Sequence, residues 1–397
     1  MWVIIGQEKA VEICNEVVQN VLNMYPEEEL IHRPIFENAF NDDYIKYSSL
    51  VSESDKMFIP WQMFFLDLKN YKNQINQIEK LRKNKFSPKF FAKRRGVGKI
   101  TSKRIIDRMI RLQNFIINNY NLSINNFCGL LKGKTQSQSM KIIIDYFGID
   151  IEELSCRTKD SVLKLLIEKI ELKNINISRG VLKGGILPEI VGVNKVYKNT
   201  SGFVVKDVRI PFIFLPDEIN PDEVVGRRIY TLIYLLACIG LDDYNFYIES
   251  EFKASALKMD GSESKKHDIV TGILLPHEET EKLKYTDVTK TTISYLASKY
   301  KITPTAIITT LKKREVITQD EYNLLLPDPY KPQKKISSPR KPSKITTSVE
   351  KFCGKVVFNL INTGIKSKSL NSIEAQYLIF GRVKKNKYKE YCRLINI

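Results

Sequence analysis

The apolar segment RRIYTLIYLLACIG, residues 227–240, is the feature that most constrains the fold. After its two arginines it carries no charged side chain, so a helix formed here is apolar on every side and must be buried. Its apolar run is shorter than the roughly 20 residues that a helix needs to span a bilayer. The preceding segment IPFIFLPDE, residues 210–218, has the pattern of a short apolar strand that ends in acids. We therefore expect this strand and helix to form the centre of a folded core.

Apolar spacing along the rest of the chain predicts an α+β fold that is mostly helical. Spacing typical of amphipathic helices occurs at 7–24, 103–120 and 162–172. Between 174 and 215, β-branched residues and glycines dominate, which predicts the strands of one small sheet. The stretch 327–346, PDPYKPQKKISSPRKPSKIT, is basic, rich in proline and free of apolar periodicity, as is typical of a flexible linker.

These changes in pattern divide the chain into five parts. The predicted parts are an N-terminal helical region (1–79), a basic helical region (80–160), a core (161–330), a basic proline-rich linker (331–348) and a C-terminal helical segment (349–397).

The chain is strongly basic, with a formal net charge of +18. Such an excess favours an anionic partner such as nucleic acid, although codon usage in an AT-rich genome also enriches Lys, Asn and Ile. The charge is concentrated between 80 and 108, where twelve basic residues stand with one acid and three phenylalanines. Basic side chains neutralise phosphates and aromatic rings stack on bases, whereas the alternative is a solvated surface whose phenylalanines face the core. The candidate nucleic-acid contacts are Lys83, Lys85, Lys89, Lys93, Arg94, Arg95, Lys99, Lys103 and Arg104.

Well-known catalytic motifs do not occur in the sequence. Residues 129–135, GLLKGKT, are one residue short of the Walker A spacing, and GxSxG, HExxH and CxxC are absent. The six cysteines are too widely spaced for a zinc ribbon and suit a reducing compartment. His267 and His277 could bind a metal with Cys238 or an acid, although isolated histidines are more often surface or capped-core residues. With no signal-peptide or membrane-spanning pattern, we expect a cytoplasmic protein without a metal or a cofactor.

Four segments between 160 and 330 occur in a recognisable order. They are SGFVVKDVRIPFIFLPDE, RRIYTLIYLLACIG, ESKKHDIVTGILLP and SYLASKYKITPTAIITTLKKREVITQDEYNLL. In order and spacing they resemble the ImmA/IrrE family of zincin-like metallopeptidases, common in phages and mobile elements. The segments resemble, in turn, two family strands, the RxxFTLxHELGH helix, the ExxANxFAAxLLMP helix, and a unit of two helices around a turn. The resemblance implies a small zincin-like sheet-and-helix core in the C-terminal half.

The same resemblance implies that the peptidase chemistry is lost. In the family, two histidines one helical turn apart bind zinc, and the glutamate after the first is the general base. The aligned residues here are Tyr234, Leu235 and Cys238. Tyrosine and leucine cannot hold zinc in this way or activate water, whereas the cysteine could be a weak second ligand. The position of the third ligand is Glu263, although an acid at a helix start is common for other reasons. The chain therefore resembles a pseudo-peptidase without catalytic residues.

The segment 291–313 has the pattern of two helices around a turn. Thr303 is placed to cap the second helix and Pro304 to open it. Helix-turn-helix proteins contact DNA through the second helix, which makes Thr309, Thr310, Lys312 and Lys313 secondary candidates for DNA contact. The alternative, implied by the resemblance, is that this unit packs against the core.

Three functions fit the sequence. The first is a non-enzymatic ImmA/IrrE-like protein of a phage or mobile element that binds protein, nucleic acid or both, as a regulator or in defence or counter-defence. The second is a DNA- or RNA-binding protein without sequence preference that uses the basic stretch 80–108. The third is an enzyme with an unrecognised site at clustered carboxylates, which could hold Mg²⁺ but also occur at helix starts. Those clusters are Asp217, Glu218, Asp222 and Glu223, and Asp242 with Asp243.

Overall fold

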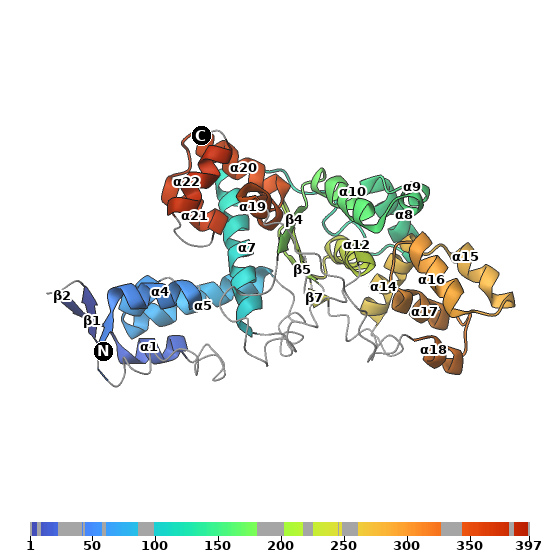
Figure 1. Ribbon diagram of the computed structural model, residues 1–397, viewed down its shortest axis with the longest axis horizontal. Helices are drawn as coiled ribbons and strands as arrows, with labels where there is room; N and C mark the ends of the chain where they lie inside the picture. The colour runs from blue at the N-terminus through green and yellow to red at the C-terminus, as the bar shows by residue number, and fades with distance from the viewer. Residues whose placement is uncertain are drawn as a thin grey trace.

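The computed structural model shows an elongated, mostly helical α+β molecule with two small sheets (Figure 1). It describes residues 2–5, 9–22, 42, 44–57, 61–85, 99–180, 202–216, 225–244, 246–247, 261–326, 344–380 and 385–395. Three apolar cores follow one another along the molecule.

The N-terminal end of the molecule is a unit with its own core (Figure 1). Its elements are β1 (Trp2–Ile5), β2 (Lys9–Glu12), α1 (Asn15–Leu22), β3 (Tyr44–Lys46), α4 (Tyr47–Met57), η1 (Trp61–Phe65) and α5 (Leu68–Lys85). The strand order is β2-β1-β3, with β1 antiparallel to β2 and parallel to β3. The prediction of one helix over 7–24 is wrong at its start, because residues 9–12 pair with β1. Val11, which the helical stripe would bury, is exposed.

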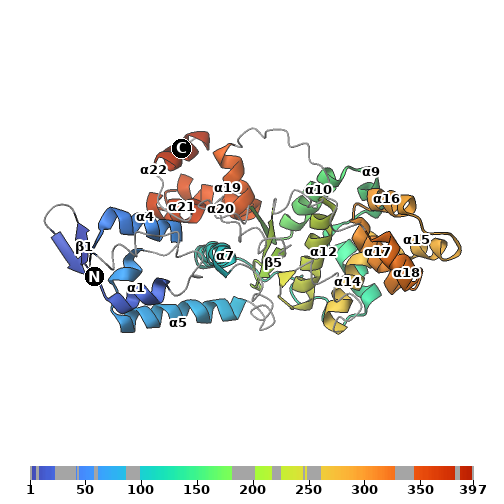
Figure 2. The same cartoon turned by 60° about the horizontal axis from the view of Figure 1, so that its bottom comes forward.

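The central sheet lies between two helical layers, as both views show (Figures 1 and 2). Its strands are β4 (Asn176–Gly180), β5 (Gly202–Val205), β6 (Phe212–Pro216) and β7 (Phe246–Tyr247), in the order β4-β6-β5-β7. β4 runs parallel to β6, and β5 runs antiparallel to both β6 and β7. Alternate side chains of β5 and β6 enter different cores, Phe203 and Phe214 on one face and Val204 and Ile213 on the other. Burial on both faces explains why these strands are apolar throughout.

The first face of the sheet is covered by α12 (Val225–Leu241), whose residues from Ile229 to Gly240 are all buried. This confirms the prediction of a helix that is surrounded on every side. The helices of this core are α8 (Gln136–Phe147), α9 (Ile151–Cys156), α10 (Lys159–Glu171), α12, α14 (Gly261–Leu274), α16 (Lys290–Lys299), α17 (Pro304–Lys313) and α18 (Gln319–Leu325), with α15 (His277–Glu281) and η3 (Lys282–Tyr285) at its edge.

The second face is covered by α7 together with the C-terminal helices. These elements are α7 (Lys99–Asn119), α19 (Ile345–Cys353), α20 (Lys355–Lys366), α21 (Ser372–Phe380) and α22 (Lys385–Leu394). Gln113 of α7 reaches the sheet, donating to the Ile210 carbonyl at 2.9 Å, and the Tyr120 hydroxyl donates to the Leu360 carbonyl at 2.6 Å.

The five predicted parts therefore do not correspond to separate cores. Residues 99–119 pack with the C-terminal helices, whereas Phe127 and Phe147 belong to the first core with residues 161–326. The boundary predicted at 160 runs through that core. Two apolar sheet faces need cover, and the local pattern does not say which helices supply it. Within the described residues, no helix combines the length and the apolar character needed to cross a membrane.

Candidate functional site

The structure brings together three positions that the family resemblance marks. Tyr234 on α12 and Glu263 in the first turn of α14 meet where these helices pack, and the Tyr234 hydroxyl donates to Glu263 Oε2 at 2.5 Å. Cys238 lies one turn after Tyr234, is fully buried, and is close enough to act electrostatically on Lys266 of α14. A tyrosine, a cysteine and a glutamate thus converge between the two helices.

Lys266 is the centre of this cluster. Its side chain is 0% exposed, and Nζ lies 3.0 Å from Glu263 Oε1 and 2.5 Å from Asp243 Oδ2. The ammonium also lies 5.7 Å from the centroid of the Tyr234 ring. Burial by itself lowers the pKa of Lys266, but Cys238, Glu263 and Asp243 outweigh burial and leave that pKa above its ordinary value. The two carboxylates therefore favour the charged form of Lys266.

Leu235 occupies the position aligned with the family's general base. It is fully buried, and a Cβ added to Gly202 would lie 2.9 Å from Leu235 Cδ1, so Leu235 packs directly on β5. Its side chain has no acid–base chemistry, and the strand leaves little space for a larger group. This position serves packing in the folded chain.

A second polar pair lies one turn away from the Lys266 cluster. The Tyr230 hydroxyl and His267 Nδ1 are 2.7 Å apart, and the ring centroids of His267 and Tyr234 are separated by 5.0 Å. His277 is at the surface, with Nδ1 3.5 Å from Glu281 Oε1. Among the described residues, no group of three or more His, Cys, Asp or Glu side chains is arranged to hold a metal ion. The suggested set of His267, His277 and Cys238 is thus not assembled.

An open pocket of about 260 Å³ adjoins this pair on the outer side of the first core. Its lining comes from α12, α14 and α17 and from the starts of α8 and α15. Its lining residues are Gln136, Tyr230, His267, Asp268, Thr271, His277, Thr309, Thr310, Lys313 and Arg314. Most of these side chains are polar, so the pocket suits a polar ligand.

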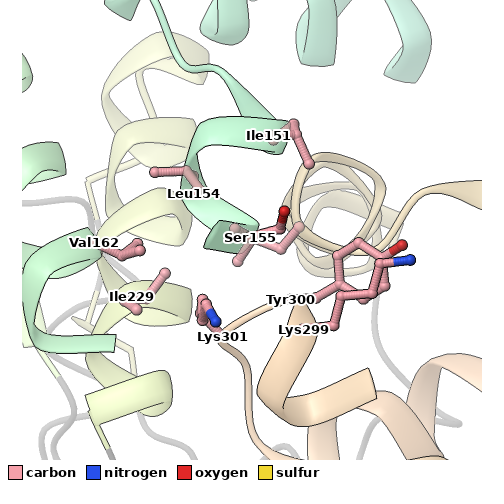
Figure 3. A pocket seen from close by; sticks show the side chains of 9 residues that line it. Ile151, Leu154, Ser155, Val162, Ile229, Lys299, Tyr300 and Lys301 are labelled. Carbon is pink, nitrogen blue, oxygen red and sulfur yellow. The ribbon is translucent and has the colours of Figure 1, made fainter. Parts of the chain in front are cut away.

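A second hollow lies between α9 and the end of α16 (Figure 3). Its volume of about 10 Å³ is close to the space of a single water molecule. Ile151, Leu154, Val162 and Ile229 form its apolar side, and Figure 3 shows Lys299 and Tyr300 on the other. This hollow is a packing defect of the core rather than a ligand site.

The basic stretch 80–108 is described only in part. Lys85, at the end of α5, lies 3.2 Å from Asp207 Oδ2 in a half-buried ion pair. Burial lowers the pKa of Lys85, and Asp207 opposes that effect. Lys83 lies in α5, and Lys99, Lys103 and Arg104 lie in α7, but their side chains are outside the described part. Lys89, Lys93, Arg94 and Arg95, like Phe86, Phe90 and Phe91, are outside the described residues altogether. Of the nine candidates, Lys85 alone is described with its contacts, and it faces a protein carboxylate.

The predicted helix-turn-helix unit forms, but its candidate DNA contacts do not share an exposed surface. Thr303 caps α17 and Pro304 opens it, which confirms that prediction. Thr309 and Thr310 are each 5% exposed, and their hydroxyls donate to carbonyls one turn earlier in α17. Lys313 pairs with Asp268 at 2.5 Å, and Lys312 is half-buried. α17 thus buries its two threonines, while Lys313 stays exposed, and DNA contact by this unit stays a prediction.

The loop GLLKGKT has a structural role. The amides of Gly129 and Leu131 donate to the carbonyls of Ile239 and Gly240 at 3.1 and 2.8 Å, which satisfies the C-terminal end of α12. Gly129 and Gly133 adopt positive φ angles of 75° and 70°, which glycine allows at little cost. Two of the amides that a phosphate loop would offer to a nucleotide are thus already engaged.

The suggested magnesium site at Asp242 and Asp243 is occupied by lysines. Asp242 pairs with Lys132 and, at 2.9 Å, with Lys206, while Asp243 pairs with Lys266. Asp217, Glu218, Asp222 and Glu223 lie outside the described residues. The described carboxylates balance protein cations and are not gathered around a common point.

Comparison with known proteins does not assign this site. No family model matches the chain, and no curated protein matches it either. Sequence reasoning missed Lys266 and Tyr230, and it named Asp243 and His267 only as candidate metal ligands, not as partners of these two residues. Lys266 follows Glu263 by three residues on one helix, so the i,i+3 rule could have found that ion pair.

Proposed function

We propose that the chain is a non-catalytic binding protein on a zincin-like scaffold, with the Lys266 ammonium in place of a metal ion. The observation that carries this proposal is the fully buried ammonium bridging Glu263 and Asp243 beside Tyr234. A metal ion in a peptidase supplies positive charge, coordinates the substrate's carbonyl oxygen and activates water. An ammonium supplies the charge alone, because it has no open coordination position. Lys266 therefore maintains the electrostatics of the core without the chemistry.

A surface feature supports a protein partner. Asn125 donates through its backbone to the Val208 carbonyl at 2.8 Å and through its side chain to the Lys173 carbonyl at 2.8 Å. These bonds bring three aliphatic residues into one region of the surface, namely Ile124, Leu172 and Val208, with 68%, 81% and 48% exposure. Clustered exposed aliphatic side chains mark interaction surfaces. Following the resemblance, we propose that this partner is a regulatory or defence protein in a phage or mobile element.

Metal content is the direct test of the lysine-for-metal proposal. We expect the unmodified chain to retain no zinc after dialysis against a weak chelator. The variant Tyr234→His/Cys238→His/Lys266→Met has two histidines one helical turn apart and Glu263 without its ammonium, so we expect it to bind one zinc ion. Adding Glu263→Gln to this variant should weaken zinc binding. Stoichiometric zinc in the unmodified chain, lost on Glu263→Gln, would contradict the proposal.

Measuring peptidase activity is a second test of the lysine-for-metal proposal. Leu235→Glu, added to the zinc-binding variant, would supply the general base, although β5 leaves little room for its carboxylate. The unmodified chain should not cleave a protein that it captures. Cleavage by the unmodified chain that persists in Glu263→Gln would point to a different active site.

The partner is tested by tagged capture from the native host, with and without nuclease. We expect a protein that survives nuclease treatment and is lost with Leu172→Glu. Leu324→Glu is the matched control, because Leu324 is 73% exposed on α18, away from this surface. Loss of the partner with both variants, or with neither, would contradict the view that this surface binds a protein partner.

Nucleic-acid binding is a second candidate, because exposed basic side chains continue onto the helices that pack with α7. Lys385, Lys389 and Arg393 follow one another at four-residue spacing on α22, and all three are exposed. Residues 345–395 contain ten Lys and Arg residues and three Glu residues. A surface of this kind would extend the contact proposed for 80–108.

A further inference from the structure

The lining of the pocket of about 260 Å³ includes two cationic side chains, one carboxylate and three threonine hydroxyls. The volume of the pocket is at the small end of the range for ligand sites, which is roughly 300–1,000 Å³. The proposal for this pocket is independent of the proposal for Lys266, because the binding groups of the pocket come mainly from α14, α17 and the residue after α17.

Arg314 is the main cationic group of the pocket. As the C-cap of α17, it donates from Nη1 to Thr280 Oγ1 at 2.8 Å, and from Nη1 and Nη2 to the Leu275 carbonyl at 3.4 Å. These bonds fix the guanidinium but use only part of its five N–H groups. Within the described part of the chain, no carboxylate forms an ion pair with Arg314. Burial lowers the pKa of Arg314, and the more distant carboxylates of Asp268, Glu281 and Glu278 partly oppose that effect. A half-buried cation without a paired anion is stabilised by an anionic ligand.

The other charged side chains of the lining are Lys313 and Asp268, which pair with each other. Lys313 is neutralised by Asp268, whose Oδ1 lies 2.5 Å from Nζ. His277 stands at the rim, and His267 is joined through Nδ1 to the Tyr230 hydroxyl. The pocket therefore contains one charge, that of Arg314, which no neighbouring side chain balances at ion-pair distance in the described structure.

The threonine part of the pocket wall offers acceptors. The hydroxyls of Thr271, Thr309 and Thr310 donate to the carbonyls of His267, Thr305 and Ala306 at 2.9, 2.8 and 2.7 Å. A threonine hydroxyl has one proton, so each of these oxygens can only accept a further hydrogen bond. A ligand that fits this wall must carry O–H or N–H donors next to its anionic group.

We propose that this pocket binds a small phosphorylated sugar, either free or as the ribose phosphate of a mononucleotide. The phosphate lies against Arg314 and His277, and the sugar hydroxyls donate to the threonine oxygens. Phosphate is the anion that a fixed guanidinium recognises well, because two N–H groups can meet two oxygens. Asp268 faces the same space and opposes an anion, so it limits the affinity.

Calorimetry on the full chain tests this proposal, with ribose 5-phosphate, inorganic phosphate, ribose and AMP as probes. We expect ribose 5-phosphate to bind more tightly than phosphate or ribose. AMP binding more tightly than ribose 5-phosphate would identify a nucleotide as the source of the sugar phosphate. Absence of binding by all four probes, or equal affinity for phosphate and ribose 5-phosphate, would overturn the proposal.

Two variants with opposite expected effects on affinity distinguish a change in binding from a loss of folding. Arg314→Gln should weaken ribose 5-phosphate by about tenfold, the effect of one charge-assisted hydrogen bond. Asp268→Asn should strengthen it several-fold, which loss of folding cannot mimic. Thr309→Val, which is nearly isosteric, should weaken ribose 5-phosphate but leave phosphate unchanged.

Arg157→Gln is the control, because Arg157 pairs with Glu153 on the surface of α9, outside the pocket lining. Equal effects of Arg157→Gln and Arg314→Gln, or no effect of Asp268→Asn, would refute the assignment.

Discussion

Replacing Lys266 with methionine removes the buried ammonium but keeps an unbranched apolar stem. The structure gives the size of the effect. At an effective dielectric constant of about 20, a pair of unit charges near 3 Å apart interacts by roughly 5 kcal/mol. Lys266 makes two such pairs, and the removal of the ammonium from water offsets several kcal/mol of their sum. The variant leaves Glu263 and Asp243 without that cation, and breaking a buried pair in this way costs about 3–5 kcal/mol.

Urea denaturation at neutral pH measures this loss. We expect Lys266→Met to lower the free energy of unfolding by about 3–5 kcal/mol, and the double variant Lys266→Met/Glu263→Gln to recover part of it. Lys299→Met is the matched control, because Lys299 pairs with Glu279 at 3.0 Å but is partly exposed, and should cost under about 1 kcal/mol. A cost for Lys266→Met as small as that of Lys299→Met would refute the view that the ammonium is the counter-charge of this core.

Three other predictions concern a tightly packed glycine, an ion-paired glutamate and the basic stretch 80–108. Gly240→Ala should destabilise the chain by about 1–3 kcal/mol in urea, because a Cβ there would lie 2.5 Å from the Leu131 side chain, whereas Gly261→Ala, which meets nothing within 4 Å, should be neutral. Hydrogen bonds from Lys282 and Lys299 hold the pKa of Glu279 at about 2, well below its ordinary value, so its stabilisation is present above about pH 4.3 and is lost as the pH falls through about 2. Glu279→Gln should therefore lower the urea midpoint at neutral pH but not below pH 2, and an equal difference at both would contradict this. If 80–108 binds nucleic acid, reversing the charges of Arg94 and Arg95 should weaken binding to most sequences alike and make its salt dependence shallower by about two units, as filter binding across a salt series would show.

The sequence predicted those helices whose formation depends on residues close together in the chain. The segment 227–240 had to be buried because it offers no polar face, and α12 is enclosed throughout. Thr303 and Pro304 predicted the start of α17 because a cap and a first-turn proline act within one turn. Residues 9–12 were misassigned because their strand depends on pairing with β1, which no local pattern records. The packing of α7 against helices more than 200 residues later was equally beyond local spacing.

In the candidate site, too, the sequence predicted some residues, whereas others are brought in only by the packing of the helices. The resemblance singled out positions 234, 238 and 263, and the structure brings them to one place. Lys266 could be found from Glu263 by helical spacing, but Asp243 could not, because it follows α12 and reaches Lys266 only through the packing of α12 on α14. Arg314 and the threonines of the pocket likewise come together from separate elements. Charge balance inside a core is a property of the assembled helices.

The Lys266 cluster also explains why restoring a metal site would need several changes. Histidines at 234 and 238 alone would place a divalent cation beside a buried ammonium, and the two positive charges would repel each other strongly at low effective dielectric. Removing Lys266 first would leave Glu263 and Asp243 without the cation that balances them, which destabilises the core. Each single step toward zinc binding is thus unfavourable. This coupling implies that the proposed non-catalytic state is stabilised by the fold itself.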